Sequence, residues 1–154
     1  MTQLNKTRAE FRNINALTDL TTYRLPPAGW VSILHRVSGA MMFLLMPFII
    51  WMFDASLSSE ISYESFTSAF SAGLGFVPGW FVKLVVLALI WGYLHHLIAG
   101  VRHLYMDATH KVSKEFGASS AKTVLVLSIG LTLVLGAKLF GLYRALPFTQ
   151  THRK

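Results

Sequence analysis

The sequence predicts an all-α membrane protein with three transmembrane helices. Hydrophobic residues make up 53% of the 154 residues and charged residues only 14%, whereas soluble domains carry about 25% charged residues. The mean hydropathy is +0.50. Apolar runs occur at about 31–53, 80–106 and 122–143, and each is long enough to cross a bilayer as a helix, which takes about 20 residues.

The first part of the chain, residues 1–30, is polar and mixed in charge, so we expect an extramembrane N-terminal arm. It contains no apolar stretch typical of a cleavable secretory signal. Pro26 and Pro27 would end any preceding helix, and proline is tolerated in the first turn of the next one. The span at 31–53 follows, and we expect Pro47 to bend it.

The segment 54–79 is predicted to be the first loop, with a short interfacial helix within 59–70 that ends before the glycines and proline of 73–79. The second span, at 80–106, leads into a predicted second loop at 107–121. The third span then runs over 122–143, and a short basic tail, 144–154, ends the chain.

Lysine and arginine in short loops predict the orientation, because such residues favour the cytoplasmic side. The first loop has none, whereas the N-terminal arm and the second loop are basic. Both are therefore predicted to face the cytoplasm, or the matrix in a mitochondrion. The tail then lies on the opposite side, although it is also basic. With this topology, the start of the first span and the end of the second lie at the same membrane level.

The composition excludes several classes of function. The chain has no cysteine, so it forms no disulfide, no c-type haem attachment and no thiolate-held iron–sulfur cluster. The net charge is +7, but the basic residues are scattered and do not form the basic face of a nucleic-acid-binding protein. The seven acidic residues are too dispersed for acid–base catalysis, and we predict no catalytic residue in this chain.

Polar residues in the second span are a candidate ligand site, because histidine is costly within a bilayer. His96, Gly100, His103 and Asp107 follow at i, i+4, i+7 and i+11 and share one helix face. A haem could lie on this face with its iron bound by a histidine nitrogen. Alternatively, His96 forms a hydrogen bond across a helix interface.

Three neighbouring residues have two interpretations each. His95 points about 100° away from His96 and would face another helix or lipid headgroups. Arg102 and His103 lie in the last turns of the span, where cations are favoured at a helix C-terminus. They either anchor the helix end or bind haem propionates, which require cationic or donor partners.

A second polar face lies in the first span, where Ser32, Arg36 and Gly39 fall at i, i+4 and i+7. A hydroxyl and a guanidinium side by side can hold a quinone carbonyl oxygen and stabilise negative charge that develops on it. The alternative is that Arg36 only anchors the span to headgroup phosphates, as basic residues at span ends commonly do.

Two motifs resemble the signatures of a known family. The segment 32–39, SILHRVSG, and the segment 96–107, HLIAGVRHLYMD, resemble the first- and second-span motifs of the large cytochrome b membrane anchor subunits of succinate dehydrogenase, also called complex II. The entry segment 22–26, TYRLP, is similar as well. The resemblance covers roughly residues 20–143, and the third span and both termini match only in character.

The resemblance implies a haem b held between this chain and a second, smaller three-span anchor subunit, with one axial histidine from each. By position, the iron ligand in this chain is His96. Ser32 and Arg36 would contribute to a quinone site on the inner side, and His35, Arg36 and His103 would lie near the haem propionates. The iron–sulfur and flavoprotein subunits would dock on the inner face.

The function expected from these observations is that of a cytochrome b membrane anchor of succinate:quinone oxidoreductase, which takes electrons from the iron–sulfur subunit. The chain itself has no centre for succinate oxidation. Alternatives are the anchor of a fumarate reductase or other dehydrogenase, and a non-redox three-span scaffold. The bacterial inner membrane is favoured over the mitochondrial one, because a long targeting segment is not evident.

Overall fold

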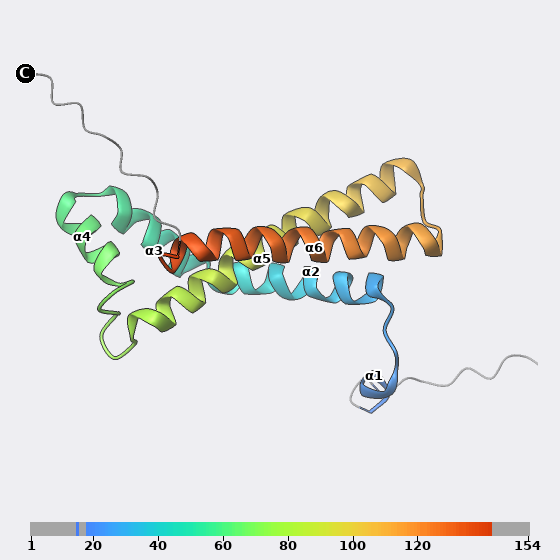
Figure 1. The fold of residues 1–154 in the computed structure, drawn as a ribbon, viewed down its shortest axis with the longest axis horizontal. Helices are drawn as coiled ribbons and strands as arrows, with labels where there is room; N and C mark the ends of the chain where they lie inside the picture. Colours follow the sequence, from blue (N-terminus) through green and yellow to red (C-terminus); the bar gives the residue numbers. More distant parts are fainter. Residues whose placement is uncertain (1–14, 16–17, 143–154) are drawn as a thin grey trace, which may run out of the picture.

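The computed structural model describes residue 15 and residues 18–142 (Figure 1). The described part is helical and contains no strand, only an isolated bridge between Leu74 and Val77. The elements are α1 (Asp19–Thr22), α2 (Pro27–Leu44), α3 (Met46–Leu57), α4 (Glu60–Ser68), α5 (Gly79–Thr109) and α6 (Lys114–Leu139). The predicted all-α class is confirmed.

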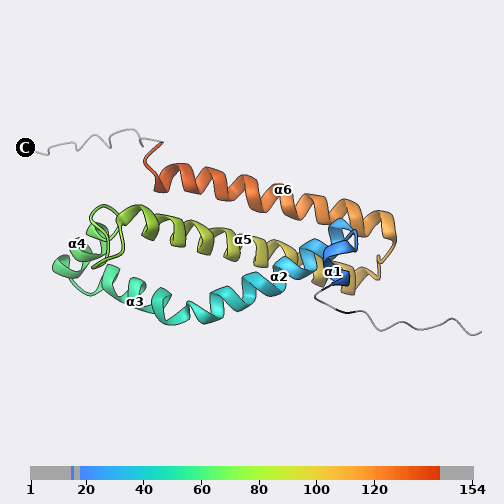
Figure 2. The same ribbon diagram turned by 90° about the horizontal axis from the view of Figure 1, so that it is seen from below.

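Helices α2, α5 and α6 form the bundle, and each of the three contacts the other two (Figures 1 and 2). The start of α2, the end of α5 and the start of α6 lie at one end of the bundle, beside α1. The opposite end carries α3 and α4. We call these the α1 end and the α4 end. Helices α5 and α6 are each long and apolar enough to span a membrane, and α2 with α3 passes the same test as one bent pair.

The break between α2 and α3 is the bend predicted from Pro47. The two helices meet at an angle of 56°, and Leu45, with φ −90° and ψ 3°, separates them. Pro47 lies in the first turn of α3, where its missing N–H and its ring prevent α2 from continuing. The predicted first span, 31–53, is therefore two helix segments rather than one kinked helix.

The connection from α3 to α5 contains the predicted interfacial helix, α4. Ser59 caps it, because the Ser59 hydroxyl accepts from the backbone N–H of Ser62 while the Ser62 hydroxyl accepts from the backbone N–H of Ser59. Gly73 has φ +102°, and a Cβ there would meet the carbonyl oxygen of Val77. Only glycine suits this tight turn before α5.

The predicted second loop, 107–121, is wrong in extent. Helix α5 continues to Thr109 and α6 begins at Lys114, so only residues 110–113 connect them. The Ser113 hydroxyl accepts from the N–H of Phe116 and caps α6. Glu115 lies in the first turn of α6, where its negative charge interacts favourably with the helix dipole. Most of the polar residues of 107–121 are still helical, although they lie beyond the apolar runs. The 31 residues of α5 extend about 46 Å, which is longer than a hydrocarbon core of about 30 Å.

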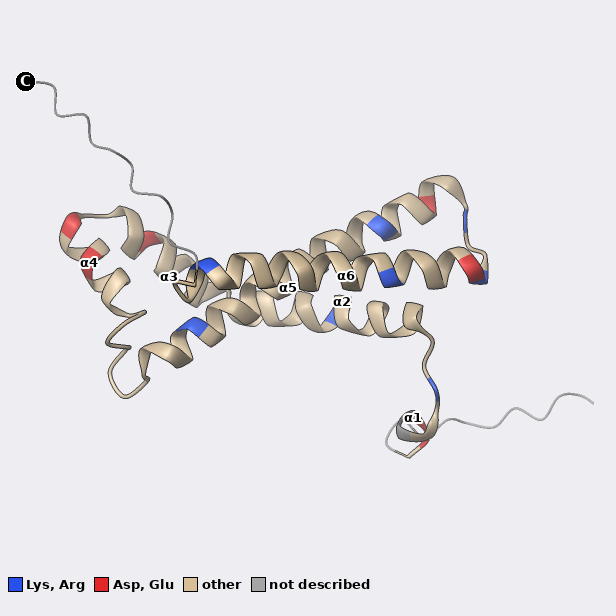
Figure 3. Ribbon diagram, viewed as in Figure 1, with Lys and Arg blue, Asp and Glu red and all other residues tan. Residues whose placement is uncertain are grey.

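Most charged residues lie toward the two ends of the bundle, and α2 carries one basic residue, Arg36, between them (Figure 3). Asp54, Glu60 and Glu64 lie at the α4 end, in α3 and α4. That end also carries Lys83, near the start of α5, and Lys138, near the end of α6. The α1 end carries Arg24, Lys111, Lys114 and Lys122. Most of the predicted arm, the end of the third predicted span at residue 143 and the predicted tail, 144–154, lie outside the described residues.

Candidate functional site

Three histidines gather between α2 and α5. The rings of His35, on α2, and His96, on α5, are stacked with centroids 4.0 Å apart and an interplanar angle of 10°. The ring of His103, two turns further along the same face of α5, has its centroid 5.3 Å from that of His35, at an angle of 58°. The fold thus brings together the histidines of two motifs that are about sixty residues apart in the sequence.

The hydrogen bonds of His96 determine which of its ring nitrogens is free. Nδ1 lies 3.0 Å from the backbone carbonyl oxygen of His35. A carbonyl oxygen only accepts, so in the neutral ring Nδ1 carries the proton and donates it, and Nε2 keeps its lone pair. This is the tautomer in which a histidine binds a metal through Nε2, and a carbonyl on the other nitrogen is a common orienting partner.

Two glycines leave room for these rings. A Cβ on Gly39 would lie 3.0 Å from Cε1 of His96, and a Cβ on Gly100 would lie 3.6 Å from Nε2 of His35. A side chain at position 39 would therefore require the His96 ring to shift by a few tenths of an ångström. Further along the interface, Gly92 faces Met41, whose terminal methyl occupies the position that a Cβ at residue 92 would take. The glycines let α2 and α5 approach closely, as small residues do in membrane helix pairs.

His95 belongs to a different part of the bundle. It is 0% exposed, its Nδ1 lies 3.3 Å from Oγ of Ser128 on α6, and its ring stacks on Trp91. Of the two interpretations open from the sequence, the one that places His95 against another helix is confirmed. His95 therefore links α5 to α6 and does not share the face of His96.

Arg102 also faces α6. It is only 9% exposed, its Nε donates to Oγ of Ser120 at 2.9 Å, and one terminal nitrogen donates to the carbonyl of Gly117 at 3.2 Å. It lies about 120° around α5 from His96. The structure thus gives Arg102 a packing role at the α1 end, which the sequence alone did not distinguish from binding a haem propionate.

The two candidate quinone residues lie on α2 near the histidine cluster. Ser32 is half-buried and Arg36 is exposed. Among the described residues, no hydrogen bond or ion pair engages either side chain. Arg36 follows His35 directly, about 100° around the helix. The hydroxyl and the guanidinium are thus available to a molecule that binds outside this chain.

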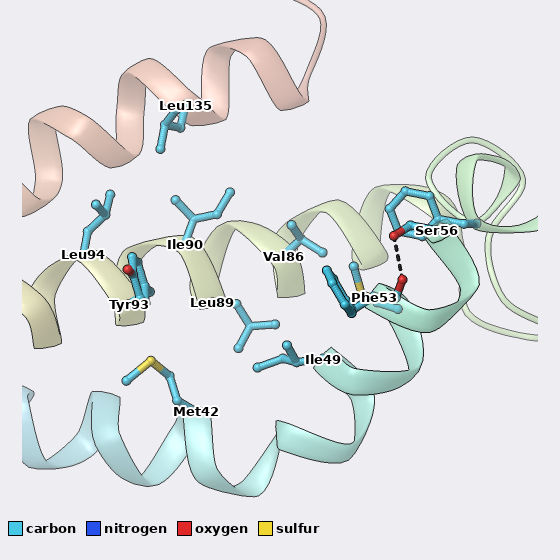
Figure 4. Close-up of a pocket in the computed structure, with 12 residues that line it drawn as sticks. Met42, Ile49, Phe53, Ser56, Val86, Leu89, Ile90, Tyr93, Leu94 and Leu135 are labelled. Atoms are coloured by element: carbon cyan, nitrogen blue, oxygen red, sulfur yellow. Dashed lines mark hydrogen bonds between the residues drawn. The ribbon is translucent and has the colours of Figure 1, made fainter. Parts of the chain in front are cut away.

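An apolar pocket of about 540 Å³ lies further toward the α4 end (Figure 4). Met42 lies two turns beyond His35 on α2, and Tyr93 lies one turn before His96 on α5, so both belong to the faces that carry the histidines. The hydroxyl of Ser56 donates to the carbonyl of Phe53 at 2.7 Å. The rest of the lining is aliphatic and aromatic and comes from α3, α4, α5 and α6: Ile49, Met52, Phe66, Val86, Leu89, Ile90, Leu94 and Leu135.

Sequence reasoning did not find this pocket or the contact of Ser38 with His96, at 3.4 Å between Oγ and Nδ1. The pocket depends on the bend at Pro47, and the contact depends on how α2 and α5 align. Within residues 15 and 18–142, no three His, Cys, Asp or Glu side chains form a candidate site for a metal ion.

Comparison with known proteins gives a consistent result. The family described as succinate dehydrogenase/fumarate reductase transmembrane subunit matches residues 12–135. The succinate dehydrogenase cytochrome b556 subunit of Coxiella burnetii is 39% identical over 110 residues, which cover 71% of this chain and 83% of the relative. Subunits of the same name from Paracoccus denitrificans, 28% identical over 75% of this chain and 83% of the relative, and from Rickettsia felis, 26% identical over 86% and 98%, are also similar. This membrane protein therefore belongs to the succinate dehydrogenase/fumarate reductase transmembrane subunit family.

Proposed function

We propose that this chain is the cytochrome b membrane anchor of a succinate:quinone oxidoreductase, where it binds haem b and helps form the quinone-reduction site. The observation that carries the proposal is the hydrogen bond from His96 Nδ1 to the His35 carbonyl. It leaves Nε2 available as a metal ligand beside the rings of His35 and His103, and an apolar pocket lies further toward the α4 end.

The residues fit a haem b, which is a flat, mostly apolar macrocycle with two propionates on one edge and iron at its centre. His96 offers Nε2 to the iron, and the absence of a side chain at Gly39 and Gly100 gives the His96 and His35 rings their places between α2 and α5. His35, Arg36 and His103 would meet the propionates with donors and positive charge. When bound, the haem supplies reversible one-electron storage, and its second axial ligand would come from a second small membrane anchor subunit.

Ser32 and Arg36 would hold the quinone head group at the α1 end. The guanidinium is always charged, and together with the hydroxyl it can stabilise negative charge on a quinone carbonyl oxygen. The exposure of Arg36 and its lack of a partner among the described residues support this role. The iron–sulfur subunit, with the flavoprotein subunit behind it, would dock at the same end and deliver the electrons taken from succinate.

We further propose that the α1 end faces the cytoplasm of a bacterial inner membrane. Arg24, Lys111, Lys114 and Lys122 lie at that end, against Lys83 and Lys138 at the other, and such an excess favours the cytoplasmic side. The names of the bacterial relatives are in keeping with this location. An N-terminal arm ahead of α2 would then be cytoplasmic.

Thiol labelling tests this orientation, because the chain has no cysteine of its own. Phe76→Cys places a thiol at a position that is 97% exposed between α4 and α5, and Lys111→Cys places one in the connection between α5 and α6. A membrane-impermeant maleimide should label the first variant in cells whose inner membrane is intact and the second only after lysis. The opposite labelling pattern would show that the orientation is the reverse of the proposed one. The proposed quinone residues would then lie on the side away from the cytoplasmic partners.

Purification through an affinity tag on this chain, from native membranes in mild detergent, tests the proposed partners. We expect a flavoprotein, an iron–sulfur protein and a second small membrane subunit to co-purify in equal amounts with succinate-dependent quinone reduction. A chain that purifies with none of them is instead a scaffold. A complex that catalyses fumarate reduction from a quinol much faster than succinate oxidation supports the fumarate reductase alternative, which the family description also covers.

A further inference from the structure

Ser38 is fully buried on α2 and contacts both partners of the central hydrogen bond. It is 0% exposed, its hydroxyl donates to the carbonyl oxygen of His35 at 2.9 Å, and its Oγ lies 3.4 Å from Nδ1 of His96. His96 Nδ1 in turn lies 3.0 Å from the same carbonyl. Ser38, the His35 carbonyl and the His96 imidazole therefore form a closed triangle of polar contacts between α2 and α5.

The triangle limits how the His96 ring can turn. The Nδ1 proton faces two oxygens, the His35 carbonyl and Ser38 Oγ, so a rotation about the bond to the ring weakens both contacts. The neighbouring Gly39 adds a wall, because the backbone of α2 passes so close that even a Cβ there would lie 3.0 Å from the ring. The stacked ring of His35 covers one face. Orienting partners of this kind, beyond the metal ligands themselves, typically change metal affinity 10- to 100-fold when they are removed.

We propose that Ser38 is a positioning residue for the haem ligand: its hydroxyl fixes the rotation and the tautomer of the His96 imidazole, so that Nε2 points at the iron. This inference rests on the proposed function, since it takes His96 to be the axial ligand. Ser38 contacts no substrate and takes part in no electron transfer. Its effect reaches the haem only through the ring of His96.

The bundle offers a matched control on its other side. Ser128 on α6 is also 0% exposed, and its Oγ lies 3.3 Å from Nδ1 of His95. Like Ser38, it donates to a carbonyl three residues earlier in its own helix, here that of Leu125. Ser128→Ala therefore removes a serine of equal burial with an equivalent histidine contact, but the histidine that it contacts lies on another face.

The experiment compares Ser38→Ala, Ser38→Thr, Ser128→Ala and the unchanged chain in the purified complex. It measures the haem content per protein, the low-spin electron paramagnetic resonance signal, and the rate at which haem passes to excess apomyoglobin. We expect Ser38→Ala to lose haem roughly tenfold faster and to change its low-spin signal, while Ser128→Ala matches the unchanged complex. Ser38→Thr keeps the hydroxyl, so it should restore both properties.

Three outcomes would overturn the inference. In the first, Ser38→Ala has the same haem retention and signal as the unchanged complex. In the second, Ser38→Thr is as impaired as Ser38→Ala, which would mean that packing volume and not the hydroxyl matters; failure of both variants to assemble counts as this result. In the third, Ser128→Ala has the same effect on the haem. If instead Ser38→Ala alone fails to assemble while Ser38→Thr is normal, the inference holds. The haem content of the unchanged complex tests the proposed function by itself. A failed Ser38 prediction with haem present in the unchanged complex would therefore leave the proposed function intact.

Discussion

Arg36→Leu and Ser32→Ala should each lower quinone reduction roughly 10- to 100-fold, while succinate oxidation measured with an artificial acceptor upstream of the quinone continues at its normal rate. A hydrogen bond that involves a charged group contributes about 1.5–3 kcal/mol, and about 1.4 kcal/mol corresponds to a factor of ten. Arg36 should give the larger effect, because it loses a full charge next to an oxygen that becomes negative during reduction. Ser32 is half-buried and carries only a hydroxyl.

The two activities are best measured in one membrane preparation, with subunit content determined in parallel. Lys122→Gln is a suitable control, because it removes an exposed cation on α6 at the same end of the bundle and should leave both activities unchanged. If both activities fall together with the subunit content in the Arg36 variant, Arg36 is an anchor of the helix and the quinone proposal is wrong. Unchanged quinone reduction would place the head group elsewhere in the complex.

The sequence predicted the fold to the extent that local chemistry decides it. The apolar runs, the bend at Pro47 and a helix within 59–70 all follow from rules that act within one segment. The second loop was overestimated because polarity indicates where a chain leaves the hydrocarbon, not where a helix ends. The caps decide that instead, at Ser113 and at His110 with its left-handed φ of 54°.

The candidate site was predictable only in part, for a similar reason. Helical periodicity places His96 and His103 on one face and His95 on another, but it does not say which neighbouring helix each face meets. That choice depends on the packing of α2, α5 and α6, which buries His95 against Ser128 and leaves His96 against the His35 carbonyl. To predict the contact of Ser38 with His96, one would need to know how α2 and α5 align to within one residue, and no local sequence pattern gives this alignment.

If His96 is the haem ligand, as proposed, His96→Ala should remove the low-spin haem b signal from the purified complex, because the chain would no longer offer its nitrogen to the iron and the triangle of polar contacts would lose the imidazole ring. A haem that remained bound would have a single histidine ligand from the second anchor, and its reduced spectrum would shift to that of a high-spin centre. Weaker retention is also expected, since removing the ligand is a larger change than removing the serine that orients it.

The adjacent histidine provides the control for this variant. His95→Gln keeps a side-chain amide near Ser128 and should change the packing of α5 against α6 without removing a ligand. Both variants alter neighbouring positions of the same helix, so a general effect of disturbing α5 should appear in both. An effect of losing the iron ligand should appear only in the His96 variant.

The most direct test of the account is therefore the reduced-minus-oxidised absorption spectrum of three purified complexes, the unchanged one, His95→Gln and His96→Ala, each at equal protein content. We expect a low-spin b-type spectrum in the first two and its loss or its shift to a high-spin form in His96→Ala. An unchanged low-spin spectrum in His96→Ala, or its loss in His95→Gln with His96 intact, would contradict the assignment of His96 as the haem ligand.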